Sequence, residues 1–203
     1  MNDFARLGSA TVYEASGRAG LVDASFHQIV PGSRAAGPAR TVQCGQADNL
    51  MVHAAIAVLH PGDVLVIAMP EPEAVALMGD LLATQAKVHG AAAVLIDGAV
   101  RDVEELAAIG LPIWARFIRI RGATKDAVGA LDVPVTIGGQ VIEPGDTVVL
   151  DADGVVVVAK ARAGEVLAAS LEREQYEVGK RAQLQAGGLS YDLDGLRSKV
   201  EGA

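Results

Sequence analysis

Three charged residues are spaced so that they could share one site, because Asp80 is followed after twenty residues by the adjacent pair Arg101 and Asp102. Two carboxylates beside a guanidinium suit a hydrated divalent metal that holds a small anionic substrate. A surface ion pair at the edge of a sheet is the alternative interpretation of the same residues. The stretch that contains them, Gly79 to Asp102, is the first candidate for a functional site.

The elements expected within this stretch would bring the three residues together. Its sequence, GDLLATQAKVHGAAAVLIDGAVRD, predicts a helix from Leu81 to His89, a strand over Ala91 to Ile96 and a turn at Asp97-Gly98. A helix of about nine residues and a strand of about five return the chain to the end from which it started. We therefore expect Asp80, at a helix N-terminus with free amides, to lie near Arg101-Asp102.

Composition and charge restrict the class of protein. The 203 residues correspond to one domain, with a catalytic domain expected over residues 1–162 and a helix and tail over residues 163–203. Hydrophobic residues make up 51% and aromatic residues 3%, so the core must be aliphatic and base stacking is unexpected. The net charge of −8 argues against a nucleic-acid partner but not against a small anion bound by local basic side chains.

Cysteine content and hydropathy indicate a cytoplasmic protein. Cys44 is the single cysteine, which excludes intrachain disulfides and a cysteine zinc cluster. The N-terminal residues contain no apolar signal core, and no apolar run is long enough to span a membrane.

The order of the remaining elements predicts an α/β fold. Strands and helices alternate up to about residue 117, which is typical of a mostly parallel sheet with crossover helices. The segments concerned are a strand around 40–43, a helix over 51–60, a buried strand over 64–68, a short helical piece before Gly79, a helix over 103–110 and a strand over 111–117.

The second half of the chain has a different pattern. From Leu131 on, short β-runs alternate with turn signals such as Asp153-Gly154, which predicts a second, antiparallel β-layer. A long helix over 163–184 follows, and its charged second half is either solvated or laid on a neighbouring molecule.

The other sequence motifs provide little evidence about function. The four histidines, at positions 27, 53, 60 and 89, lack a metal-binding spacing and are expected to be structural or on the surface. Nucleotide-binding glycine motifs and the nucleophile elbow are absent from the sequence.

The stretch GDLLATQAKVHGAAAVLIDGAVRDVEEL resembles the class II pyruvate aldolases that act on 4-hydroxy-4-methyl-2-oxoglutarate and 4-carboxy-4-hydroxy-2-oxoadipate in aromatic-ring degradation. That family shares a fold with the regulator of ribonuclease E activity A. Its signature, Asp, twenty residues, then Arg-Asp, stands here as Asp80, Arg101 and Asp102. The similarity continues through GDVLVIA, VTIGGQVIEPGDTVVLDADGVVVV and EREQYEVGKRAQLQAGGLSYDLDGLR, and so covers nearly the whole chain. It implies an αββα sandwich with a C-terminal helical arm.

The resemblance also implies roles for individual residues in metal-dependent retro-aldol cleavage. Asp102 would ligate Mg2+ or Mn2+, Arg101 would stabilise the pyruvate enolate, and Asp80 would orient a metal-bound water that shuttles the proton. The backbone amides of Gly79, Asp80, Leu81 and Leu82 would bind the pyruvate carboxylate.

Further family positions correspond to four other residues. Asn49 and Lys125 would recognise substrate, although a helix cap and a surface lysine are their alternative interpretations. Glu14 and Glu177 would act as catalytic residues in a neighbouring subunit's site, and the family assembles as homotrimers and homohexamers.

Three functions remain open at this point. The first is cleavage of a 4-hydroxy-2-oxo di- or tricarboxylic acid to pyruvate, with oxaloacetate decarboxylation as a side activity. The second is oxaloacetate decarboxylation alone, which uses the same enolate chemistry. The third is a non-catalytic, ribonuclease-binding regulator, for which the acidic surface suits a basic partner.

Overall fold

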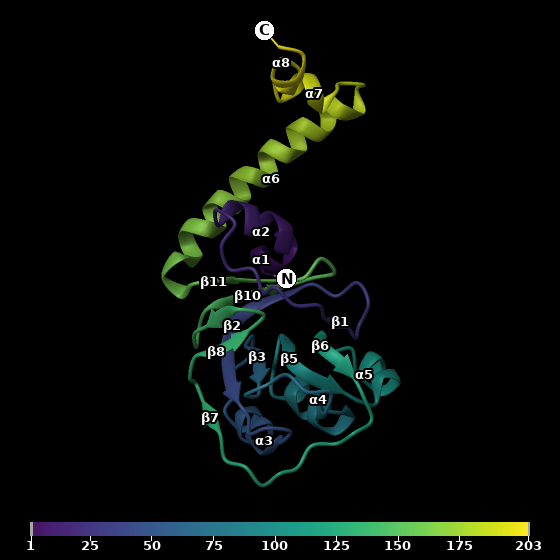
Figure 1. Cartoon of the computed structure of the whole chain (residues 1–203), viewed down its shortest axis with the longest axis vertical. Helices are drawn as coiled ribbons and strands as arrows, with labels where there is room; N and C mark the ends of the chain where they lie inside the picture. The colour runs from purple at the N-terminus through teal and green to yellow at the C-terminus, as the bar shows by residue number, and fades with distance from the viewer. Residues whose placement is uncertain (1, 203) are drawn as a thin grey trace.

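The computed structural model describes residues 2–202, which are arranged in four layers, helices on both outsides and two β-layers between them (Figure 1). Three clusters of buried apolar side chains separate these layers. The outer helices are α3 (Leu50–Ala57), α4 (Asp80–Val88) and α5 (Val103–Ile109) on one side, and α1 (Asp3–Leu7), α2 (Ser9–Ala15) and α6 (Ala163–Gln185) on the other. The αββα sandwich that the family resemblance implies is confirmed.

The first β-layer is mostly parallel because its strands are joined through crossover helices. Its central strands are completely buried, which explains why they are continuous runs of aliphatic residues rather than alternating ones. The strands are β3 (Val64–Ala68), β4 (Ala76–Met78), β5 (Ala93–Val100), β6 (Ile113–Ile118) and the second half of β2 (Ala35–Gln43).

Strand β2 connects the two β-layers. Its residues 39–43 pair in parallel with β3, whereas residues 35–38 pair antiparallel with β10. At Gly37 the backbone of Gly62 approaches so closely that a Cβ atom would clash with its carbonyl oxygen. The antiparallel strands are β10 (Thr147–Leu150), β11 (Val155–Val158), the hairpin β8 (Val135–Ile137) and β9 (Gln140–Ile142), and the short β1 (His27–Gln28) and β7 (Ala130–Leu131).

The C-terminal helix α6 extends beyond the sandwich (Figure 1). Its first half packs on α1 and α2, where Val166 and Ser170 are its buried residues. The second half of α6 carries the short helices α7 (Ser190–Leu193) and α8 (Leu196–Glu201) away from the core. The 3-10 turn η1 (Lys160–Arg162) directly precedes α6. Within residues 2–202, no helix combines the length and apolar character needed to cross a bilayer.

Two local predictions are wrong. Asp97-Gly98 does not form a turn, because β5 continues through it to Val100 and pairs with β6 up to Ile118. The buried Asp97 carboxylate pairs with Arg116, and the missing side chain of Gly98 leaves room for Met69 and Leu77. The piece before Gly79, expected to be helical, forms β4 because its apolar residues pair with the end of β5.

Candidate functional site

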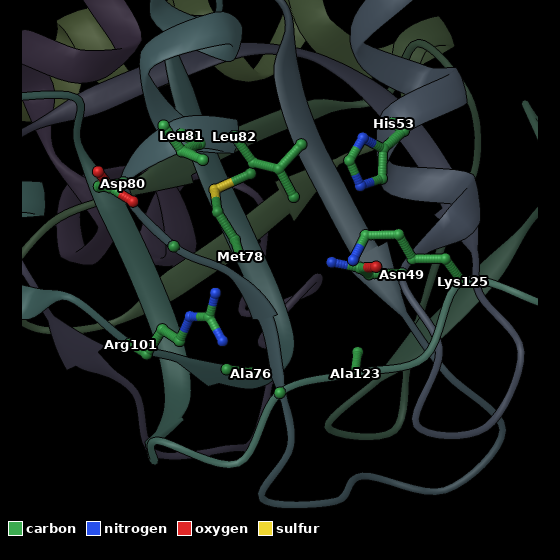
Figure 2. A pocket seen from close by; sticks show the side chains of 12 residues that line it. Asn49, His53, Ala76, Met78, Asp80, Leu81, Leu82, Arg101, Ala123 and Lys125 are labelled. Atoms are coloured by element: carbon green, nitrogen blue, oxygen red, sulfur yellow. The ribbon is translucent and has the colours of Figure 1, made fainter.

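A cavity of about 130 Å³ lies outside the carboxyl ends of the parallel strands β4 and β5 (Figure 2). Sites in α/β sheets gather at these ends. A cavity of about 150 Å³ can hold benzene, which has as many non-hydrogen atoms as pyruvate. The cavity is lined by Asn49, His53, Ala76, Met78, Gly79, Asp80, Leu81, Leu82, Arg101, Gly122, Ala123 and Lys125.

One wall of the cavity is the N-terminus of α4. The helix begins at Asp80 after Gly79, and Gly79 has no side chain that could cap it. Helix geometry directs the free N–H groups of its first turn out of this end, where they attract an anion. All four residues predicted to bind a carboxylate through their amides (Gly79, Asp80, Leu81 and Leu82) line the cavity.

Asp102 connects this helix end to the end of β5. It adopts a left-handed backbone conformation with φ 58° and precedes α5, but its side chain does not cap that helix. Instead, its Oδ2 accepts a hydrogen bond of 3.3 Å from the backbone N–H of Asp80. Aspartate tolerates this conformation better than most residues, and such backbone strain is concentrated at functional sites. The predicted proximity of Asp80 and Asp102 is confirmed.

Arg101 lies between two close backbone segments. Its Nε is 3.4 Å from Oδ2 of Asp102, and a Cβ atom on Gly122 would lie 3.0 Å from its Nη1. The guanidinium points into the cavity (Figure 2), and half of the side-chain surface remains exposed. Arg101 therefore presents donors to a ligand that also touches the N-terminus of α4.

The opposite wall carries Asn49, His53 and Lys125, and the Lys125 ammonium reaches inward from the side facing Arg101 (Figure 2). Asn49 is 7% exposed, and its amide nitrogen donates to the carbonyl of Leu77 at 3.0 Å. Its Oδ1 is buried and has no partner within residues 2–202. The two cationic walls favour a ligand with negative charge at both ends.

His53 was missed as a cavity residue. Metal-binding spacing does not indicate this position, whereas helix periodicity does, because His53 follows Asn49 by one helical turn on α3. Residues four apart lie on the same helix face.

Glu14 and Glu177 lie in the helical layer on the other side of the sandwich from this cavity (Figure 1). Glu14, on α2, pairs with Arg18 at 3.3 Å, and Glu177, on α6, pairs with Arg173 at 2.9 Å. Within one chain the structure therefore does not bring them to Arg101, and any role there requires a second copy.

The ligand set suits a weakly held, hydrated ion better than a protein-enclosed metal. No cluster of three or more His, Cys, Asp or Glu side chains able to hold a metal is found in residues 2–202. Asp102 is about one-third exposed and uses Oδ2 for both of its contacts, so Oδ1 can still ligate. Mg2+ keeps several waters and binds through one or two carboxylates, which fits this donor set.

Asp102 does not line the cavity itself. It faces an adjoining surface depression together with Glu104, Glu105 and Arg119, and Arg101 lines both hollows. Arg101 therefore borders both the cavity and the depression that Asp102 faces.

Known sequences include relatives of this chain. Residues 9–157 match the family described as RraA-like, Aldolase/RraA. A curated protein of Halalkalibacterium halodurans with the provisional name 4-hydroxy-4-methyl-2-oxoglutarate aldolase is 42% identical over 131 residues. The match covers 64% of this chain and 62% of the length of that relative.

Solved structures show the same fold. One, described as S-adenosylmethionine: 2-dimethylmenaquinone methyltransferase from Geobacillus kaustophilus, has a TM-score of 0.69 at 35% identity, covering 74% of this chain and 94% of the other. Streptomyces coelicolor RraAS2, described as an unusual member of the RNase ES inhibitor RraA protein family, has a TM-score of 0.76 at 31% identity, covering 89% and 96%. Since the family match spans most of the sequence, the chain belongs to the RraA-like, Aldolase/RraA family.

Proposed function

We propose that this protein is a divalent-metal-dependent pyruvate aldolase. It cleaves a 4-hydroxy-2-oxo di- or tricarboxylic acid, such as 4-carboxy-4-hydroxy-2-oxoadipate or 4-hydroxy-4-methyl-2-oxoglutarate, to pyruvate and a second 2-oxo acid. Oxaloacetate decarboxylation is a side activity, because it passes through the same enolate. The name of the Halalkalibacterium halodurans relative supports this class of reaction.

One observation carries the proposal: Arg101 and the N-terminus of α4 line the same cavity. A 2-oxo acid has a carboxylate and a carbonyl oxygen on adjacent carbons. The amides of the first turn of α4 bind that carboxylate, and Arg101 donates to the adjacent 2-oxo oxygen.

Arg101 has the larger effect on the reaction rate. When the C3–C4 bond of the substrate breaks, its electrons move into the pyruvate part and negative charge develops on the C2 oxygen. A guanidinium that is already directed at this oxygen stabilises that charge more than it stabilises the neutral carbonyl. Asp102 would hold a divalent ion, which would supply Lewis-acid chemistry to the 2-oxo acid.

Asp80 provides a route for the proton. It lies at the edge of the cavity (Figure 2). In our proposal a water molecule connects its carboxylate to the C4 hydroxyl of the substrate. Through this water, the Asp80 carboxylate takes the hydroxyl proton as the second 2-oxo acid forms. The proton then returns to C3 of the enolate, which completes pyruvate and restores the carboxylate.

The opposite wall recognises the rest of the substrate. Lys125 provides a positive charge for the second carboxylate, and Asn49 contributes to the same wall. In our proposal a homotrimer or homohexamer brings Glu14 and Glu177 of a second copy to this open side. The exposed side chains of Leu81, at the cavity, and Ile120, at the adjoining depression, support contact with another chain.

A ribonuclease-binding regulator is the alternative function. The description of the Streptomyces coelicolor structure names a ribonuclease inhibitor family, and the net charge of −8 suits a basic partner. This role needs neither Arg101 directed into a cavity nor a helix N-terminus beside it, so the aldolase remains the better-supported proposal.

The test is pyruvate release, followed with lactate dehydrogenase, from 4-carboxy-4-hydroxy-2-oxoadipate and separately from oxaloacetate. Each reaction is run with Mg2+ and with EDTA. We expect Mg2+-dependent pyruvate from both substrates, faster from the hydroxy acid. Release from oxaloacetate alone would reassign the protein as a decarboxylase. No release from either substrate would favour the ribonuclease-binding role, which a pull-down with ribonuclease would then examine.

A further inference from the structure

A buried carboxylate, Asp48, lies directly behind the wall of the cavity that carries Asn49 and Lys125. It is 1% exposed and pairs with no basic side chain within residues 2–202. Its charge is instead satisfied by four hydrogen bonds. A buried ionised group without a counter-ion persists only when its oxygens are well provided with donors.

Those donors come from two segments far apart in the sequence. Oδ1 accepts from the backbone N–H of Leu50, the first residue of α3, at 2.8 Å. Oδ2 accepts from the Thr124 hydroxyl at 2.6 Å and from the backbone N–H groups of Asp126 and Ala127 at 2.6 and 3.1 Å. Burial alone would raise the pKa of this carboxyl, but the four donors outweigh burial and lower it to about 2.

The two segments are the ones that present the distal wall. Lys125 lies between Thr124 and Asp126, and therefore between two residues held by Asp48. Asn49 lies between Asp48 and Leu50 at the start of α3, and its backbone N–H donates to the carbonyl of Thr124 at 2.9 Å. Beyond this junction, the connection from β6 to β7 is largely irregular and exposed.

We propose that Asp48 is a positioning residue that fixes Lys125 and Asn49 relative to the α4–Arg101 wall, and so sets the affinity for the distal carboxylate of the substrate. The inference rests on the proposed aldolase function. Asp48 touches no substrate in this account. It acts because its carboxylate is the junction between α3 and the segment 122–129.

Asp48→Asn tests the proposal most directly. The amide keeps the side-chain size but turns an NH2 group toward donors that need an acceptor. Thr124→Val removes one of the four hydrogen bonds at nearly constant side-chain shape. This variant tests the proposal if Asp48→Asn fails to fold. Asp126→Asn is the matched control, because it changes the same charge in the same segment while keeping the backbone N–H that Asp48 accepts.

Three readouts are compared: KM and kcat for 4-carboxy-4-hydroxy-2-oxoadipate, the rate at which pyruvate exchanges its methyl protons with D2O, and backbone hydrogen exchange of the peptide covering 122–129. For Asp48→Asn we expect KM to rise about tenfold or more, with faster hydrogen exchange in the peptide. Pyruvate exchange should stay within about twofold, since it needs only the α4–Arg101 wall. Thr124→Val should show the same pattern more weakly, and Asp126→Asn should match the wild type.

An unchanged KM in Asp48→Asn and Thr124→Val, or unchanged protection of the peptide, would overturn the inference. An equal loss of pyruvate exchange and of cleavage would overturn it as well, because Asp48 would then support the whole site. If the wild-type protein neither cleaves the hydroxy acid nor exchanges pyruvate protons, the proposed function itself fails. Peptide protection still decides in that case whether Asp48 holds the segment.

Discussion

The carboxylate of Asp102 occupies the space that a side chain at Gly79 would need: a Cβ atom added there would overlap Oδ2 of Asp102. The backbone of Gly79 is extended, with φ −135° and ψ −166°, so any residue could adopt its conformation. Glycine is required here by the close approach alone. Through this contact the α4 N-terminus and the end of β5 are held together.

Gly79→Ala should therefore abolish most activity while leaving the fold intact. The added methyl group must displace Asp102 and the neighbouring Arg101, whose Cγ and Nε lie 3.3 Å from the position of the new Cβ atom. We expect the rate of pyruvate release to fall about 10²-fold, as for other small displacements of catalytic groups. Gly179→Ala on α6 is the control, because its Cβ meets no atom within 4 Å. It should keep full activity and gain about 0.5–1 kcal/mol in stability.

Arg101→Lys should show that the guanidinium, and not only its charge, is needed. A lysine cannot donate in the same fork geometry to the developing enolate oxygen. We expect kcat for pyruvate release to fall about 10²–10³-fold. Arg121→Lys is the matched control, since Arg121 is exposed and pairs with Glu73. Equal activities of the two variants would contradict the assignment of Arg101.

Asp102→Asn should weaken the response to Mg2+ without unfolding the chain. Asparagine tolerates the left-handed conformation at this position and can still accept from the Asp80 N–H, so the helix end stays in place. The concentration of Mg2+ needed for half-maximal pyruvate release should rise at least about tenfold, because an amide is a weaker ligand than a carboxylate. Glu105→Gln, on the adjacent depression, should leave this concentration unchanged.

Asp48 should make the protein sensitive to acid. Its folded-state pKa is lowered to about 2 from a reference value of 3.8, so its contribution to stability is fully present above that reference value. The contribution is lost as pH falls through the folded-state pKa. Thermal unfolding is measured from about pH 5 to about pH 2, the range in which an aspartate takes up its proton. Over this range Tm should fall less for Asp48→Asn than for the wild type. At pH 7 the variant should be less stable by about 2 kcal/mol. A parallel loss of Tm in both proteins would contradict this account.

A shared site can be tested by mixing inactive variants. If Glu177 of one copy completes the cavity of another, Arg101→Lys and Glu177→Gln should each be inactive. Mixed oligomers of the two should recover part of the activity, because some sites then contain two wild-type contributions. Recovery should require subunit exchange, which native mass spectrometry would confirm. Full activity of Glu177→Gln alone would remove Glu177 from the site.

The parallel sheet with crossover helices, the second β-layer and the meeting of Asp80 with Asp102 could be predicted because they follow from local periodicity and segment length. The four-layer arrangement was implied by the family resemblance. The sequence pattern failed where tertiary pairing overrode a local signal. Asp97-Gly98 has the composition of a hairpin turn, but it lies within a strand flanked by parallel neighbours, where Arg116 pairs with its carboxylate. The role of Asp48 could not be predicted, since nothing local shows that residues 124–127 return to it.

The most direct test of the central claim is whether the protein enolises pyruvate. Pyruvate is incubated in D2O with the protein and Mg2+, and its methyl signal is followed by proton NMR. If Arg101 and the α4 N-terminus stabilise the enolate, the wild type should remove the methyl signal and Arg101→Lys should leave it almost unchanged. Retention of the signal with folded wild-type protein and Mg2+, or equal exchange by the variant, would contradict the claim.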